Sequence, residues 1–169
     1  VEATAKRLGV KGGEAVAYPP ALNHHQQRIL DWSALPAPVP PERAAEATGL
    51  ALAIARELDL QGLLCVELFV VDDRLLLNEL AVRPHNSGHL TVEACATSQF
   101  ENHVRAVLGL PLGATNLRVP AECMVNVVGS AAGGAPLRRL DAGLAVPGAR
   151  VQRNGKVPRP RRAQHAALH

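Results

Sequence analysis

The chain has 169 residues, 47% of them apolar, and a formal net charge of +3; this length fits one domain of ordinary size, or two small lobes, with a real core. A mild basic excess without interleaved aromatic residues argues against nucleic acid, and no apolar run reaches the roughly 18 residues that span a bilayer. Three scattered cysteines are typical of a reducing compartment, so we expect a cytoplasmic protein that binds neither nucleic acid nor membrane.

The first part of the chain predicts short strands. Residues 1–9, "VEATAKRLG", read as a strand, and "EAVAYPP" at 14–20 reads as a second strand ended by two prolines. Residues 22–32, "LNHHQQRILDW", are interpreted as a third extended piece. The proline-rich "LPAPVPP" at 35–41 is a connector to the next element.

Two helices are predicted. The clearer one covers 41–59, "PERAAEATGLALAIARELD", because Pro41 suits the first turn and Glu42 lies where the helix dipole favours an acid. The second covers 90–109, "LTVEACATSQFENHVRAVLG", and is stopped by Gly109 and a following proline.

Between the helices, "GLLCVELFVV" (62–71) and "RLLLNELAV" (74–82) are apolar strands joined by "DD", which most simply form a hairpin. Further on, "AECMVNVVG" (121–129) and "ARVQRNGK" (149–156) indicate two more strands before a basic tail. Strands and helices in this order predict an α+β fold.

The hairpin carries two acids whose relative position depends on the turn. A three-residue turn over 72–74 places Glu67 directly across from Glu79, with Cβ atoms about 5 Å apart. A two-residue turn instead places Asn78 opposite Glu67. The sequence leaves this register open.

Two carboxylates inside an apolar sheet repel each other and lose hydration, which costs several kcal/mol unless a cation binds. A single Glu in a strand usually lies on a solvated face, but here both faces of each strand are apolar. Oxygen ligands without a Cys or His partner favour a hard ion, Mg²⁺ before Zn²⁺. Glu67 and Glu79 are therefore candidate metal ligands.

The end of the second strand gathers polar residues: residues 78–89 read "NELAVRPHNSGH". This stretch, together with "VELFV", "EACATSQFENHVRAVLGLPLG", "MVNVVG" and the earlier "YPPALNHHQQRILDWSALPA", resembles successive blocks of 5-(carboxyamino)imidazole ribonucleotide synthase, an ATP-grasp family of purine biosynthesis. The family's usual wording is N-E-I-A-P-R-P-H-N-S-G-H. The resemblance runs from about residue 5 to residue 165.

The resemblance implies an activity. The family makes an acyl phosphate from bicarbonate and ATP, and then passes the carboxyl group to the exocyclic amine of aminoimidazole ribonucleotide. ATP and Mg²⁺, with Mn²⁺ as a substitute, would be its cofactors, and a homodimer its typical state. By this resemblance the enzyme is an ATP-grasp ligase.

Roles for residues follow from the same resemblance. Glu67 and Glu79 match the family's Mg²⁺-binding acids, Asn78 and Glu79 match its nucleotide-contacting pair, and His25 matches a His beside the ATP site. The residues that match the loop for the ribonucleotide are Arg83, which is also the candidate catalytic residue, His85, Asn86 and Ser87. Lys156 and Arg162 look like the family's basic pair for the substrate phosphate.

The resemblance also predicts the domain organisation. Residues 1–113 correspond to the second lobe of the ATP-grasp fold, an antiparallel sheet with two helices, and 114–169 to a small β-rich carboxy-terminal domain with a basic tail. The family's Gly-rich loop and amino-terminal Rossmann-like domain have no counterpart here. We therefore expect a carboxy-terminal piece of a longer protein that does not turn over substrate alone.

Two other interpretations remain open. The chain could be a non-catalytic folded module that dimerises through its apolar sheet. It could also belong to another ATP-grasp ligase that uses the same acids on a different acceptor.

Overall fold

The computed structural model describes residues 1–5, 13–127 and 144–152. Its contacts divide the chain into one compact unit, Val1–Asn126, and a second unit, Val127–His169. The described part of the second unit contains a turn in which the Ala149 N–H donates to the Val146 carbonyl. Residues 149–152 form no strand, and the rest of the strand predicted over 149–156 lies outside the described residues.

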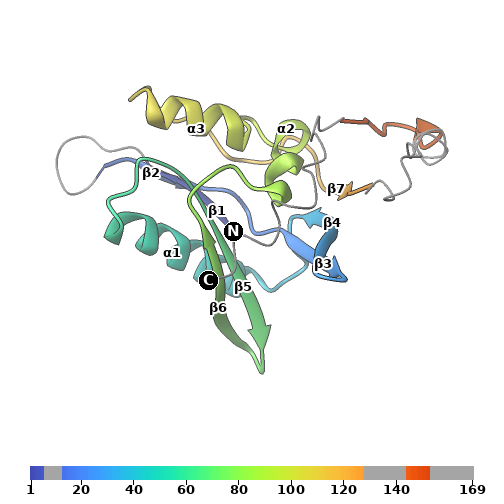
Figure 1. The fold of residues 1–169 in the computed structure, drawn as a ribbon, viewed down its shortest axis with the longest axis horizontal. Helices are drawn as coiled ribbons and strands as arrows, with labels where there is room; N and C mark the ends of the chain where they lie inside the picture. Colours follow the sequence, from blue (N-terminus) through green and yellow to red (C-terminus); the bar gives the residue numbers. More distant parts are fainter. Residues whose placement is uncertain (6–12, 128–143, 153–169) are drawn as a thin grey trace, which may run out of the picture. The chain divides into compact units, whose positions relative to one another are not determined.

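The described elements confirm an α+β fold built on two antiparallel sheets (Figure 1). The first sheet has the order β2-β1-β5-β6, and the second the order β3-β4-β7. The strands are β1 (Glu2–Ala5), β2 (Ala15–Ala17), β3 (Leu22–Gln26), β4 (Ile29–Leu35), β5 (Gly62–Val71), β6 (Arg74–Ala81) and β7 (Glu122–Val125). The helices are α1 (Pro41–Glu57), the 3-10 helix η1 (Asn86–Leu90), α2 (Thr91–Ala94) and α3 (Gln99–Val107).

Helices cover both faces of the four-stranded sheet, as Figure 1 shows for α1 and α3. Leu63 and Leu64 are neighbours in β5, so their side chains point to opposite faces, and both are fully buried. Leu64 packs with the alanines of α1, whereas Leu63 packs with Tyr18 and with Leu90 at the end of η1. The core is aliphatic on the α1 side and includes the aromatic Tyr18 on the other, and each fully buried Leu contributes about 1.5–3 kcal/mol.

The extended piece predicted over 22–32 is wrong, because these residues form the β3–β4 hairpin. The chain reverses at Gln27 and Arg28, which both have positive φ, 51° and 64°. Such a two-residue turn matches the right-handed twist of strands but usually contains Asn or Gly. The turn lacks both residues, so nothing in the local sequence marks it.

The second predicted helix, over 90–109, is interrupted. Cys95 has an extended backbone and pairs with Leu117 in an isolated bridge. The chain returns to helix at Ser98, whose hydroxyl accepts the N–H of Glu101 and caps α3. Pairing with a distant segment and a local cap together replace one long helix by two shorter ones.

The predicted domain boundary at residue 113 falls inside the first unit. β7 pairs antiparallel with β4, so residues that follow 113 complete the three-stranded sheet. The compact unit accordingly extends to Asn126. The β-rich character of 114–169 remains a prediction, since most of residues 128–169 lie outside the described part of the chain.

Candidate active site

A β-bulge in the β5–β6 hairpin brings the two acids opposite each other. The turn has two residues, Asp72 and Asp73, both at positive φ, and not the three that would produce this pairing in a regular hairpin. The register then shifts between Glu67 and its neighbour Leu68, so that Glu67 pairs with Glu79. Asn78 is the extra residue of the bulge. The structure therefore combines the two-residue turn of one predicted register with the Glu67–Glu79 pairing of the other, and the bulge creates that pairing.

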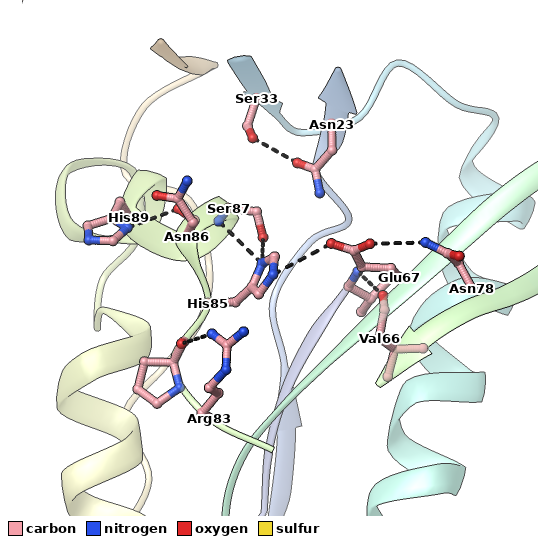
Figure 2. A network of polar contacts seen from close by, with 12 residues as sticks. Asn23, Ser33, Val66, Glu67, Asn78, Arg83, His85, Asn86, Ser87 and His89 are labelled. Atoms are coloured by element: carbon pink, nitrogen blue, oxygen red, sulfur yellow. Dashed lines mark hydrogen bonds and ion pairs between the residues drawn. The ribbon is translucent and has the colours of Figure 1, made fainter. Parts of the chain in front are cut away.

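Glu67 lies at the centre of a polar cluster in which its two carboxylate oxygens have different partners (Figure 2). Asn78 donates its side-chain amide to Oε2 at 3.2 Å, and His85 Nε2 lies 3.6 Å from Oε1. The Glu67 side chain is only 16% exposed. Contacts from β6 and from the loop that follows it therefore fix the direction of this carboxylate.

The His85 ring is oriented by the start of η1. Its Nδ1 accepts the Ser87 N–H at 3.4 Å and lies 2.8 Å from the Ser87 hydroxyl. Because Nδ1 is the acceptor, the ring hydrogen of neutral His85 belongs on Nε2, which faces Glu67 in Figure 2.

Burial lowers the pKa of His85, which favours the neutral ring. Glu67 opposes this shift, Arg83 adds to it, and Glu79 opposes it. The carboxylates of Glu67 and Glu79 thus both act on the same imidazole, as expected for side chains directed to one side of the hairpin.

The predicted loop residues lie together. The Asn86 carbonyl contacts His89 Nδ1 at 2.9 Å, and the His89 ring packs edge-on against Phe100. Ser87 is buried, whereas the Arg83 guanidinium is exposed and donates to the carbonyl of its neighbour Pro84 at 3.2 Å. Arg83, His85, Asn86 and Ser87 are therefore presented on one short segment after β6.

Among the described residues, one predicted site residue, His25, is not joined to this cluster. His25 is exposed in β3 of the second sheet, where its Cα pairs with Leu30. Lys156 and Arg162 lie outside the described residues. Their predicted roles stay predictions.

Asn23, two residues before His25, was not predicted. In Figure 2 its amide nitrogen points toward the His85–Glu67 pair, while its Oδ1 accepts the Ser33 hydroxyl at 2.7 Å. Asn23 also lines a pocket together with Ser87 and Gly88. Alternation along β3 does not indicate Asn23 from His25, because the register of this strand shifts between His24 and His25.

The exposure of the hairpin corrects one expectation. Glu79 is exposed, and so are its apolar neighbours Leu77 and Leu80, at 52% and 38%. The premise that both acids lack a solvated side is therefore wrong for Glu79. An apolar strand pattern does not by itself distinguish a covered strand from an open one.

The two carboxylates can supply only part of the coordination shell of a Mg²⁺ ion. Among the described residues, no group of three or more His, Cys, Asp or Glu side chains could hold a metal ion. Two carboxylates on paired strands still fit Mg²⁺, because this ion is usually held by one or two carboxylates while water and phosphate oxygens complete its shell. The residues suit a metal shared with a nucleotide.

Comparison with known protein families shows the class of protein to which this sheet, acid pair and loop belong. Residues 2–100 match the family model described as the ATP-grasp domain. The chain therefore belongs to the ATP-grasp family.

None of the helices in the described part has both the length and the apolar character that crossing a membrane requires.

Within this family the chain is similar to enzymes named N5-carboxyaminoimidazole ribonucleotide synthase. It is 52% identical over 118 residues to the N5-carboxyaminoimidazole ribonucleotide synthase of Bacillus subtilis (strain 168), covering 69% of this chain and 31% of that protein. It is 43% identical over 157 residues to the synthase of Mycobacterium tuberculosis (strain ATCC 25618 / H37Rv), covering 89% and 36%. The predicted resemblance is confirmed, and the chain spans about a third of the length of these curated relatives.

Solved structures of enzymes with this name are similar to the chain in fold and in sequence. The crystal structure of N5-carboxyaminoimidazole ribonucleotide synthetase from Thermus thermophilus has a TM-score of 0.80 and 42% identity, covering 94% of this chain and 41% of that one. The ADP complex of an N5-carboxyaminoimidazole ribonucleotide synthetase has a TM-score of 0.75 and 41% identity, covering 85% and 37%.

Proposed function

We propose that this chain forms the metal-binding and acceptor-binding part of an ATP-grasp ligase that carboxylates 5-aminoimidazole ribonucleotide, using ATP and bicarbonate. The pairing of Glu67 with Glu79, directly followed by the 83–87 loop, is the observation that carries the proposal. The similarity to synthases of this name supports the choice of acceptor.

Glu67 and Glu79 would hold Mg²⁺, or Mn²⁺ in its place. When bound, the ion supplies charge neutralisation at the nucleotide phosphates. Asn78 orients the Glu67 carboxylate through its amide, and its bulged position lets it share nucleotide contacts with Glu79. His25 would complete the ATP side from the second sheet.

The loop would receive the other substrates. Arg83 presents an exposed guanidinium, which suits a carboxylate or phosphate oxygen and makes it the candidate catalytic residue. His85 keeps a hydrogen on Nε2, while Asn86 and Ser87 place amide and hydroxyl groups beside it. Lys156 and Arg162 would bind the phosphate of the ribonucleotide.

Calorimetry with Mg²⁺-ATP tests the acid pair on the protein that carries this chain. Glu67→Gln and Glu79→Gln should each weaken binding at least about tenfold, because a neutral amide is a poor Mg²⁺ ligand. Glu101→Gln is the matched control, since Glu101 is an exposed acid of α3 paired with Arg105. Equal affinity in all three variants would refute the metal site and favour a non-catalytic module.

The acceptor is tested separately. ADP release with bicarbonate should depend on aminoimidazole ribonucleotide and not on glycinamide ribonucleotide; the reverse would assign the chain to another ATP-grasp ligase.

The isolated 169-residue chain should not turn over substrate at enzyme-like rates. A cytoplasmic homodimer completes the proposal, and light scattering of the purified protein checks the dimer.

A further inference from the structure

Gln99 has no role in the proposed site, although it lies in the block "EACATSQFENHVRAVLGLPLG" that resembles the synthase family. It is the first residue of α3, and its side chain is completely buried. A buried amide without partners is costly, so the partners of Gln99 are informative.

Both ends of the Gln99 amide bind the backbone of His85. Gln99 Oε1 accepts the His85 N–H at 3.1 Å, and Gln99 Nε2 donates to the His85 carbonyl at 2.6 Å. A side-chain amide offers one donor and one acceptor at this spacing without carrying a charge. The backbone of His85 is thus clamped by a side chain that approaches from a different helix.

A second link reaches the far end of the loop. The Gln99 N–H donates to Thr91 Oγ1 at 2.8 Å, and the Thr91 hydroxyl donates to the Gly88 carbonyl at 2.6 Å. Thr91 and Gly88 are both buried. Gln99 therefore holds the loop at His85 directly, and at Gly88 through Thr91.

We propose that Gln99 is a positioning residue: by clamping the His85 backbone, it directs the imidazole toward Glu67 and so sets the geometry between the acceptor loop and the carboxylate pair. His85 Nε2 lies 3.6 Å from Glu67 Oε1, and Nδ1 of the same ring contacts Ser87 within the loop itself. A rotation of the His85 backbone moves the ring and its Ser87 contact together. The catalytic consequence rests on the proposed function, whereas the geometry does not.

Asn102 supplies the matched control. It lies three residues further along the same helix, is equally buried, and clamps the N–H and carbonyl of Gly113 with its own amide. The chemistry of this clamp is the same, and a further bond from the Asn102 amide goes to the Tyr18 hydroxyl, so neither partner is part of the 83–87 loop. General damage to α3 should therefore appear in the Gln99 variants and in the Asn102 variants alike. Displacement of His85 should appear in the Gln99 variants alone.

The test compares Gln99→Ala and Gln99→Met with Asn102→Ala and Asn102→Leu. Gln99→Met keeps the length of the side chain and loses both the donor and the acceptor, whereas Gln99→Ala also removes the side chain beyond Cβ. The first readout is the ring ¹⁵N chemical shifts of His85 at one neutral pH in the 169-residue chain. Both Gln99 variants should change these shifts, and both Asn102 variants should leave them unchanged.

The second readout is steady-state kinetics on the protein that carries the chain. The Gln99 variants should lose on the order of 10–100-fold in kcat/KM for the ribonucleotide, with KM for ATP within about twofold of the parent. Unchanged His85 shifts in a folded Gln99→Met or Gln99→Ala protein would overturn the proposal, and so would equal shifts in the Asn102 variants. Altered shifts in a protein that shows no carboxylation would uphold the positioning role and refute the proposed function instead.

Discussion

The buried amide of Asn102 allows a stability prediction with a magnitude. Its Nδ2 donates to the Tyr18 hydroxyl at 2.8 Å and to the Gly113 carbonyl at 3.1 Å, and its Oδ1 accepts the Gly113 N–H at 2.8 Å. Replacing Asn102 with Leu keeps the shape of the side chain and removes all three bonds. Each is worth about 1 kcal/mol net, and more where the remaining partner stays buried without a substitute. We expect the free energy of unfolding to fall by about 2–4 kcal/mol.

Urea denaturation of the 169-residue chain measures this loss as a lower midpoint at constant slope. Tyr18→Phe, made alone and together with Asn102→Leu, isolates the bond to the hydroxyl, which should account for about 1 kcal/mol of coupling. A loss below about 1 kcal/mol at unchanged slope would refute the reasoning, because it would mean that water replaces these bonds. A coupling near zero would show that the hydroxyl contributes nothing to the network.

Three further predictions concern single positions. Gly49→Ala in α1 should raise the free energy of unfolding by about 0.5–1 kcal/mol, since nothing lies near the added methyl group and Ala favours helix; a lower thermal midpoint would contradict this. Gly113→Ala should lower it by about 1–3 kcal/mol, because the new Cβ collides with the Thr97 side chain; an unchanged urea midpoint would show that Thr97 moves aside freely. Burial lowers the pKa of His85 in the folded chain below its ordinary 6.5. The unfolded chain therefore binds a proton at His85 more readily than the folded chain does. The free energy of unfolding should consequently fall as pH drops from 6.5 toward the lowered pKa. His85→Gln should flatten that decline, measured as urea midpoints across the window, and an identical decline in the variant would assign it to other groups.

Local signals predicted the elements that depend on neighbours in the sequence. Helix α1 begins at Pro41 with Glu42 in its first turn, and the limits of β5 and β6 follow the apolar runs closely. The two acids of the hairpin were also visible in the sequence, but their pairing did not follow from the spacing, because the two-residue turn alone would place Asn78 opposite Glu67. Ser98 and Glu101 form a capping pattern that could have indicated the start of α3, although it lies inside a longer helical pattern.

The remaining features depend on partners far along the chain. The break at Cys95 is made by pairing with Leu117, and the extension of the first unit is made by β7 pairing with β4. The bulge at Glu67 has no local signature, because Asn78 suits a regular strand position as well as a bulged one. The role of Gln99 was hidden for the same reason: its partner His85 lies in another element.

The irregular ladder between β5 and β6 has a consequence for variation among related proteins. One skipped residue decides which side of the ribbon each later side chain faces. With one residue fewer between Asp73 and Asn78, the same two-residue turn would place Glu79 opposite Glu67 in a regular ladder without a bulge. With one residue more, the two acids would stay opposite each other only through a longer turn or a second bulge. A related protein that is one residue shorter at this tip should therefore keep the acid pair and lose the bulge, while the identity of its apolar side chains is free to drift.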